Sequence, residues 1–278
     1  MQNIKISLAG DLGSGKSTVG KILEQRLGVR YYSTGTIQRE IAEGMGMTTL
    51  QLNQYMETHP EIDRKIDDGL RALEHAEADL VIDSRMAWHF VPSSFSVYMM
   101  ADPLVAAARI LGAGRAHESF STVEEAAASV AARRKSEALR YKSMYGVDIQ
   151  DLENYDYVID TSFVSPDTVA ERIAAHYRLH AAGTRFARYE ICPARLLPAG
   201  SEAGAPAFAE SDGFFYIVSG AEEIARAIGR GEPLIACSCC PLEDAAAFAR
   251  EHCTAETVAA WAHRTGVEPA RLPAFLRR

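Results

Sequence analysis

A glycine-rich loop near the N-terminus constrains this chain more than any other feature. Residues 10–17 read Gly-Asp-Leu-Gly-Ser-Gly-Lys-Ser and fit the pattern G-x-x-x-x-G-K-[ST] at every fixed position. An apolar run over residues 4–9 precedes the loop, and a helical pattern from about Ser17 to Leu27 follows it. Glycines let successive backbone N–H groups turn inward as an anion-binding nest, and the helix adds the positive end of its dipole. The sequence therefore predicts a strand, a phosphate-binding loop (P-loop) and a helix in succession.

The motif assigns chemical roles to several side chains. Lys16 would reach the β- and γ-phosphates of ATP, and the Ser17 hydroxyl would ligate Mg²⁺. Asp83 ends an apolar run and is the expected second holder of the magnesium ion. Asp160 ends a similar run, so position alone does not separate the two carboxylates. The residues predicted to bind ATP are Gly10, Gly13, Ser14, Gly15, Lys16, Ser17 and Thr18.

Short β-like runs alternate with longer helical patterns up to residue 180. The predicted strands are residues 4–9, 29–33, 80–83, 96–100 and 157–160. This alternation is typical of an α/β fold, here a P-loop NTPase domain, with a parallel sheet and helices on both faces. A helix opened by Pro166 ends at Ala182-Gly183, where we place a domain boundary. We therefore expect a P-loop domain over residues 1–183 and a small accessory α+β domain over residues 184–278.

The charge balance and the apolar pattern narrow the classes of partner. The 278 residues carry a formal net charge of −8, whereas nucleic-acid binders need basic surfaces. No stretch approaches the ~18–20 apolar residues that span a bilayer. The N-terminus has neither a basic region nor a cleavage-site pattern, so we expect a cytoplasmic protein. Neither nucleic acid nor a membrane is an expected partner.

The content of the first domain indicates which kind of P-loop protein this is. The sequence has no N-K-x-D segment, which switch GTPases use to read their base, and residues 1–183 match the size of a small-molecule kinase. Such a kinase aligns two phosphates and neutralises developing charge, so it needs arginines beside the acceptor. Arg39 and Arg85 follow the second and third predicted strands and are candidates, because a planar guanidinium suits a phosphate. Each could instead form a surface salt bridge.

A further group of arginines is a candidate for a mobile lid. Its members, all between the fourth and fifth predicted strands, are Arg109, Arg115, Arg133, Arg134 and Arg140. The alternative is a solvated helix face with i,i+4 pairs, such as Arg133 with Glu137. Composition alone does not decide between the two interpretations.

Several segments beyond the P-loop carry a resemblance to a known family. The acceptor-like segment Ser33-Thr34-Gly35 through Arg39-Glu40 is one, and the run Arg140-Tyr141-Lys142-Ser143-Met144-Tyr145-Gly146-Val147-Asp148-Ile149 is the most specific. The other matching segments are residues 47–55, 60–63 and 151–162. Over residues 4–180 the chain resembles the short, archaeal-type cytidylate kinases among the nucleoside monophosphate kinases.

The resemblance implies transfer of the γ-phosphate of ATP to a pyrimidine nucleoside monophosphate, with CMP or dCMP as the default. By that match, Lys16 and Ser17 serve the donor. The residues that would bind the acceptor are Ser33, Gly35, Arg39 and Arg85. The arginines that would close over the transferring group are Arg109, Arg133 and Arg140. Asp148 and Asp160 would flank the lid and the donor base. Two alternatives remain: a kinase for another small phosphorylated acceptor, and a nucleotide-sensing regulator with an interaction domain.

Residues 184–278 take no part in this resemblance. The pattern D-G-x-[FY]-Y-I-V-x-G at residues 212–220, followed by a helix, faintly resembles ParB-like domains. Those domains carry His and Arg in the next few residues, whereas this chain has Ser219-Gly220-Ala221-Glu222-Glu223. The pattern favours a small regulatory or interaction domain whose partner is a protein or a ligand.

All five cysteines lie in this C-terminal region. Cys237, Cys239 and Cys240 lack the paired C-x₂-C spacing of structural zinc sites. We therefore expect free cysteines that behave as small buried hydrophobes, with a redox-sensing pair as the alternative.

Overall fold

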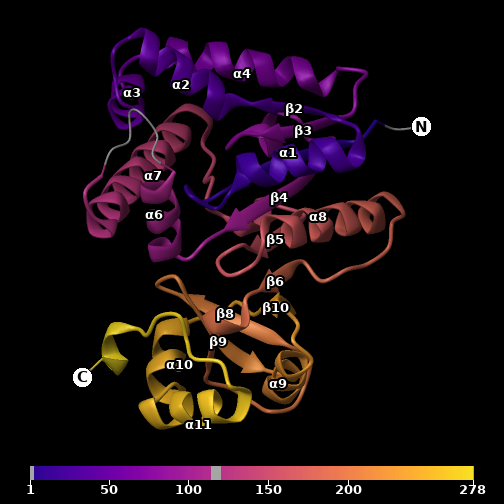
Figure 1. The fold of residues 1–278 in the computed structure, drawn as a ribbon, viewed down its shortest axis with the longest axis vertical. Helices are drawn as coiled ribbons and strands as arrows, with labels where there is room; N and C mark the ends of the chain where they lie inside the picture. Colours follow the sequence, from indigo (N-terminus) through magenta and orange to yellow (C-terminus); the bar gives the residue numbers. More distant parts are fainter. Residues whose placement is uncertain (1–2, 114–119, 278) are drawn as a thin grey trace. The chain divides into compact units, whose positions relative to one another are not determined.

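The computed structural model describes residues 3–113 and 120–277 (Figure 1). The chain divides into two compact units, Met1–Arg185 and Phe186–Arg278. The sequence placed this division after residue 183.

A parallel five-stranded sheet forms the centre of the first unit. Its strands, in spatial order, are β2 (Arg30–Ser33), β3 (Leu80–Asp83), β1 (Lys5–Gly10), β4 (Phe95–Met100) and β5 (Tyr157–Asp160). Every residue of β1, β3, β4 and β5 is buried, as expected for a parallel sheet covered on both faces. Since all five strands run in the same direction, their carboxyl ends share one edge, where ligands of open α/β sheets bind.

Helices cover both faces of this sheet, so the predicted α/β class is confirmed. They are α1 (Lys16–Leu27), α2 (Thr34–Gly44), α3 (Thr49–Met56), α4 (Pro60–Glu74), α5 (Ala87–Phe90), α6 (Pro103–Gly112), α7 (Val123–Tyr145) and α8 (Pro166–Ala181), with a short 3₁₀ turn at Leu152–Asn154. On one face, α1 packs against α8 and the strands β2 and β3. On the other, Leu80 and Ile82 of β3 pack with Leu70 of α4, Ala87 of α5 and Tyr141 of α7.

The long helix α7 positions a row of charged side chains beside the sheet edge. It begins after Thr122, whose side chain accepts a hydrogen bond from the Glu125 backbone N–H. It ends at Gly146, whose left-handed conformation (φ 70°) lets the chain leave the helix. The segment from Val123 to Tyr145 is therefore a single helix.

The second unit is α+β, as the sequence predicted. Its strands lie in the order β6 (Tyr189–Ile191), β10 (Ile235–Cys239), β8 (Ala207–Ser211), β9 (Phe214–Ser219) and β7 (Leu196–Pro198). The β8–β9 turn has Asp212 at φ 53° and Gly213 at φ 76°, both positive, as a tight hairpin requires. The helices are α9 (Ala221–Gly229), α10 (Ala245–His252) and α11 (Ala255–Thr265), and short 3₁₀ turns occupy Pro193–Arg195 and Ala274–Leu276.

Candidate functional site

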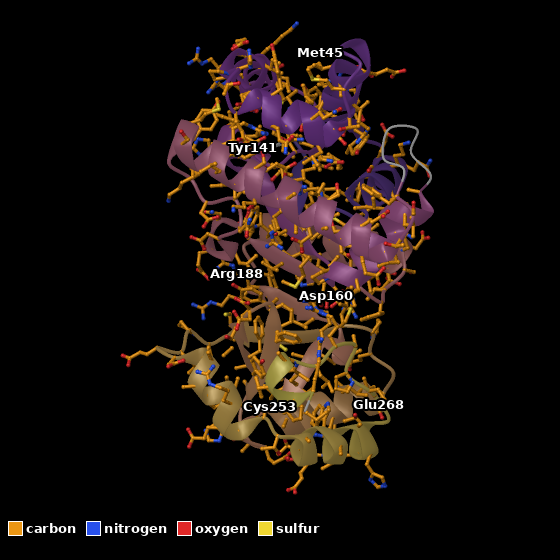
Figure 2. All side chains as sticks on the ribbon, turned by 90° about the vertical axis from the view of Figure 1, so that its left-hand side faces the viewer. Met45, Tyr141, Asp160, Arg188, Cys253 and Glu268 are labelled. Carbon is orange, nitrogen blue, oxygen red and sulfur yellow. The ribbon has the colours of Figure 1, made fainter. Side chains whose placement is uncertain are left out.

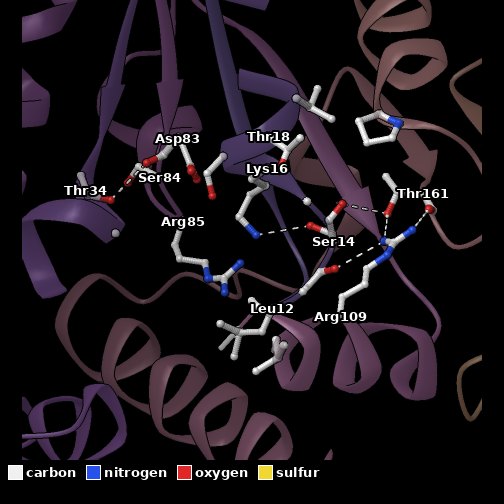
Figure 3. Close-up of a pocket in the computed structure, with 18 of the residues that line it drawn as sticks. Leu12, Ser14, Lys16, Thr18, Thr34, Asp83, Ser84, Arg85, Arg109 and Thr161 are labelled. Atoms are coloured by element: carbon white, nitrogen blue, oxygen red, sulfur yellow. Dashed lines mark hydrogen bonds between the residues drawn. The ribbon is translucent and has the colours of Figure 1, made fainter. Parts of the chain in front are cut away.

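A cavity of about 360 Å³ lies at the carboxyl edge of the sheet in the first unit (Figure 3). The P-loop, the end of β3 and parts of α2, α6, α7 and α8 form its wall. The predicted site residues that line it are Gly13, Ser14, Gly15, Lys16, Ser17, Thr18, Gly35, Arg39, Asp83, Arg85, Arg109 and Arg133. The predicted site residues Gly10, Ser33 and Arg140 do not line this cavity.

The P-loop backbone turns on glycines with positive φ. Gly13 and Gly15 have φ values of 78° and 88°, a region that only glycine enters readily. Gly15 is the N-cap of α1, so the first turn of that helix has no side-chain cap. The backbone N–H groups of this turn are therefore suited to an anion.

Lys16 reaches back across the loop from the first turn of α1. Its Nζ donates to the carbonyl oxygens of Gly10 (3.0 Å) and Asp11 (2.7 Å). Burial, followed by the nearby charge of Arg85, lowers the pKa of Lys16 to about 7. Figure 3 shows the Lys16 and Arg85 side chains pointing into the same space. An anion between two such cations would favour the charged lysine, so this part of the cavity suits a phosphate.

Asp83 is held in place by a tyrosine that the sequence did not single out. The Tyr31 hydroxyl donates to Asp83 Oδ2 at 2.7 Å, and the Asp83 backbone oxygen accepts from Thr34 Oγ1 at 3.3 Å. The Tyr31 ring lies over Gly20 of α1, where a Cβ atom would overlap the ring. A glycine in the middle of a helix was the one signal in the sequence for this contact.

The residues present fit a magnesium ion. Ser17 and Asp83 line the same cavity and offer a hydroxyl and a carboxylate oxygen. Hard oxygen ligands, few in number and supplemented by nucleotide phosphates, are what Mg²⁺ takes in such sites. Asp160 does not line the cavity; its Oδ1 accepts from the Ser162 backbone N–H at 3.0 Å. Position in the sequence could not distinguish these two carboxylates, and in the structure only Asp83 of the two lines the cavity.

Arg85 and Arg133 meet on one buried carboxylate. Arg85 Nε lies 2.8 Å from Glu137 Oε2, and Arg133 Nε lies 2.9 Å from Glu137 Oε1. The Glu137 side chain is only 4% exposed. Burial alone would raise the pKa of Glu137, but Arg85, Arg133 and Arg140 together lower it to about 2. Glu137 therefore stays ionised, and the pair that the sequence suggested as a solvated i,i+4 contact is part of the cavity wall.

The two remaining arginines of the cavity are Arg39 on α2 and Arg109 on α6. On α2, Arg39 donates to Thr36 Oγ1 at 3.0 Å, and Ser33 caps that helix from just outside the cavity. On α6, Arg109 donates to the carbonyl oxygens of Thr161 (2.7 Å) and Ser162 (3.1 Å). Beside Arg109 the wall becomes apolar, with Ile110, Ala113, Val164, Pro166 and Val169. This part suits a flat, weakly polar group such as a nucleobase.

Other members of the predicted lid lie elsewhere. Arg140 is buried between α3, α4 and α7, where its Nε is 2.8 Å from Asp63 Oδ2 and Nη1 donates to Asn53 Oδ1 at 3.1 Å. Arg134, which is exposed, forms an ion pair of 3.3 Å with the mostly buried carboxylate of Asp11 in the P-loop. Arg115 lies outside the described residues. In this structure Arg140 joins helices rather than facing the cavity.

The cysteines of the second unit show no zinc-like arrangement. Cys192, Cys237 and Cys253 are buried, and burial raises the pKa of Cys237 to about 12 and of Cys253 to about 11. Figure 2 marks Cys253, which packs beside Ala249 and Val258. Over residues 3–113 and 120–277, no group of three or more His, Cys, Asp or Glu side chains could hold a metal. Within the same residues, no helix is long and apolar enough to cross a membrane.

Comparisons with known proteins identify a family for the first unit. The model of the cytidylate kinase-like family matches residues 5–163. A cytidylate kinase of Thermoplasma volcanium is 35% identical over 171 residues, covering 60% of this chain and 87% of that protein. A cytidylate kinase of Sulfolobus acidocaldarius is 38% identical over 172 residues, covering 61% and 92%.

Two further matches are weaker, one because it covers only part of the relative and the other because its sequence identity and TM-score are low. An S-adenosylmethionine-dependent nucleotide dehydratase of Lacinutrix mariniflava is 35% identical over 175 residues, which are 63% of this chain but only 36% of that protein. A shikimate kinase structure from Aquifex aeolicus covers 65% of this chain and 99% of its own at 18% identity, with a TM-score of 0.40.

Proposed function

The chain belongs to the cytidylate kinase-like family, and we propose that it transfers the γ-phosphate of ATP to CMP or dCMP in an Mg²⁺-dependent reaction. One observation carries this proposal: Lys16, Arg85 and Arg133 line a single cavity together with the P-loop. The Glu137 carboxylate compensates part of this buried positive charge, and an anionic ligand in the cavity would compensate more of it. The dehydratase match covers about a third of that protein, so it supports a shared nucleotide-binding domain rather than its named activity.

The donor would lie along the P-loop and α1. Its β- and γ-phosphates would accept hydrogen bonds from the loop N–H groups and from Lys16. Its base would lie against Arg109 and the apolar wall around Pro166. Ser17 and Asp83 would hold Mg²⁺, which, when bound, neutralises charge on the β- and γ-phosphates. Tyr31 would keep the Asp83 carboxylate oriented through its 2.7 Å hydrogen bond.

The acceptor's phosphate would lie between the P-loop and the arginines of α2, α7 and the segment after β3. Arg39, Arg85 and Arg133 all line the cavity. They would hold the acceptor oxygen in line with the γ-phosphate while Lys16 stabilises the charge that spreads over the transferring group. No covalent intermediate is needed, because positioning and charge neutralisation supply the catalysis.

A coupled assay with purified full-length chain tests this proposal. ATP·Mg²⁺ is offered with CMP, dCMP, UMP or AMP, and ADP formation is followed. Turnover highest with CMP or dCMP supports the proposal. If none of the four is used, phosphorylated acceptors that are not nucleotides are offered in the same assay, and turnover with one of these alone would identify a different kinase. ATP binding without turnover on any acceptor would favour a nucleotide sensor.

Arg85→Ala should weaken binding of the acceptor more than binding of the donor. The variant loses one charge-assisted contact to the acceptor phosphate, which corresponds to roughly a 10- to 100-fold rise in the KM for CMP. The KM for ATP should stay within about twofold, since the donor relies on the P-loop. Arg64→Ala, an exposed arginine of α4, is the matched control. An unchanged KM for CMP would remove Arg85 from the acceptor site.

The second unit is proposed to be a cytoplasmic accessory domain that regulates the kinase or binds a protein or ligand partner. It lies outside residues 5–163, which the family model matches, and all site residues named above belong to the first unit. A chain ending at Arg185 should therefore keep CMP turnover within about a factor of ten, measured in the same assay, because no phosphate-binding residue is removed. Loss of turnover in a soluble, folded truncation would show that the second unit contributes to catalysis.

A further inference from the structure

Glu137 is a buried acid that lies between two of the cavity's arginines. Each of its carboxylate oxygens binds a different guanidinium, Arg85 at 2.8 Å and Arg133 at 2.9 Å. Arg85 follows β3, whereas Arg133 and Glu137 lie one helical turn apart on α7. The carboxylate therefore joins two elements that are 52 residues apart in the chain.

Arg85 and Arg133 contact Glu137 through the same atom of the guanidinium group. Both of these contacts use Nε, on the inner side of the guanidinium. Both arginine side chains also line the cavity, so the carboxylate anchors them from the side of the stem while they face the ligand space. Two forked donors fixed by one shared anchor keep a constant spacing, which is what recognition of a phosphate requires.

We propose that Glu137 is a positioning residue that fixes Arg85 and Arg133 as one paired site for the acceptor's phosphate. This inference rests on the proposed function, and it adds a residue that would itself touch neither nucleotide. A carboxylate repels a phosphate, so its burial in a phosphate-binding cavity needs a reason. Here the reason is orientation: without Glu137 two like-charged guanidinium groups would separate.

A rival role for Glu137 predicts the opposite result. If the carboxylate only offset excess positive charge, removing its charge would make the cavity more cationic and bind phosphate more tightly. If Glu137 positions the arginines, the same change weakens binding. Gln at this position keeps the volume, but its amide nitrogen is a donor and would face an arginine donor.

The experiment compares full-length wild type with Glu137→Gln, Glu137→Asp and Glu124→Gln. Glu124 is an exposed acid near the start of the same helix and serves as the matched control. We measure kcat and KM for CMP and ATP, and the Kd of CMP without ATP by calorimetry. For Glu137→Gln we expect the Kd and KM for CMP to rise at least tenfold, with the KM for ATP within twofold. Glu137→Asp keeps the charge but is one methylene shorter. We therefore expect a smaller rise in the Kd and KM for CMP, again with little change in the KM for ATP.

Tighter or unchanged CMP binding in a folded Glu137→Gln chain would overturn the proposal, and so would an equal rise in the KM values of both nucleotides. Circular dichroism and the thermal midpoint show whether each variant folds; if Gln does not, Glu137→Asp decides by the same criteria. If the wild type neither binds nor phosphorylates CMP, the proposed function fails. Inorganic phosphate then serves as the calorimetric probe: weaker phosphate binding by the variant supports the paired site, and unchanged or tighter binding contradicts it.

Discussion

Replacing Lys16 with alanine should reduce kcat for phosphoryl transfer by about a thousandfold, while the first unit stays folded. Lys16 would donate to the γ-phosphate oxygens, and its charge would matter most when negative charge spreads in the transition state. Its present partners are the carbonyl oxygens of Gly10 and Asp11, at the start of the P-loop. Truncation therefore removes the ammonium from the reacting group and leaves the sheet contacts intact.

Steady-state kinetics with saturating ATP and CMP measure this effect, and circular dichroism checks the fold. Lys21→Ala is the matched control, because Lys21 lies on the same helix α1 with an exposed side chain. That control should keep wild-type turnover. If Lys16→Ala retains more than a tenth of the wild-type kcat, the P-loop does not place this lysine at the transferring phosphate.

Local patterns in the sequence predicted most of the first unit. The five strands, the P-loop and helices α1 and α8 were all expected within a few residues of their observed bounds, because each depends on short-range periodicity and on capping residues. The two glycines that the P-loop motif fixes, Gly10 and Gly15, both have positive φ values, of 129° and 88°. The edge of the sheet at which the site lies then follows from strand direction alone.

Contacts between distant segments could not be predicted in the same way. Arg133 and Arg140 are two helical turns apart on α7 and look equivalent in sequence. Only packing shows that Arg140 meets Asp63 of α4 while Arg133 lines the cavity. The i,i+4 spacing of Arg133 and Glu137 was visible, but the third partner, Arg85, comes from another element. Because Arg85 also binds Glu137, the Arg133–Glu137 ion pair is part of a buried contact between α7 and the segment after β3.

Gly10→Ala should destabilise the first unit by about 4 kcal/mol, because it combines backbone strain with overlap in the core of the sheet. Gly10 ends β1 with φ 129°, a conformation that other residues rarely adopt. It lies opposite Met99 of β4, and a Cβ atom would overlap the backbone nitrogen and oxygen of Met99. Relief would require β1 and β4 to separate, which would break the 2.9 Å hydrogen bond from the Asp11 N–H to the Met99 oxygen.

Gly15→Ala is the matched control, because Gly15 also has a positive φ but a Cβ atom added there would meet nothing within 4 Å. The control therefore has only the strain of the left-handed conformation, which costs about 1–2 kcal/mol. Urea unfolding followed by tryptophan fluorescence measures both variants. The two tryptophans, Trp88 and Trp261, lie in different units, so a Trp261→Phe background leaves Trp88 as the reporter of the first unit. Equal losses in the free energy of unfolding for Gly10→Ala and Gly15→Ala would mean that backbone strain alone explains the cost. The close approach of β1 to β4 would then not be the reason that the P-loop begins with a glycine.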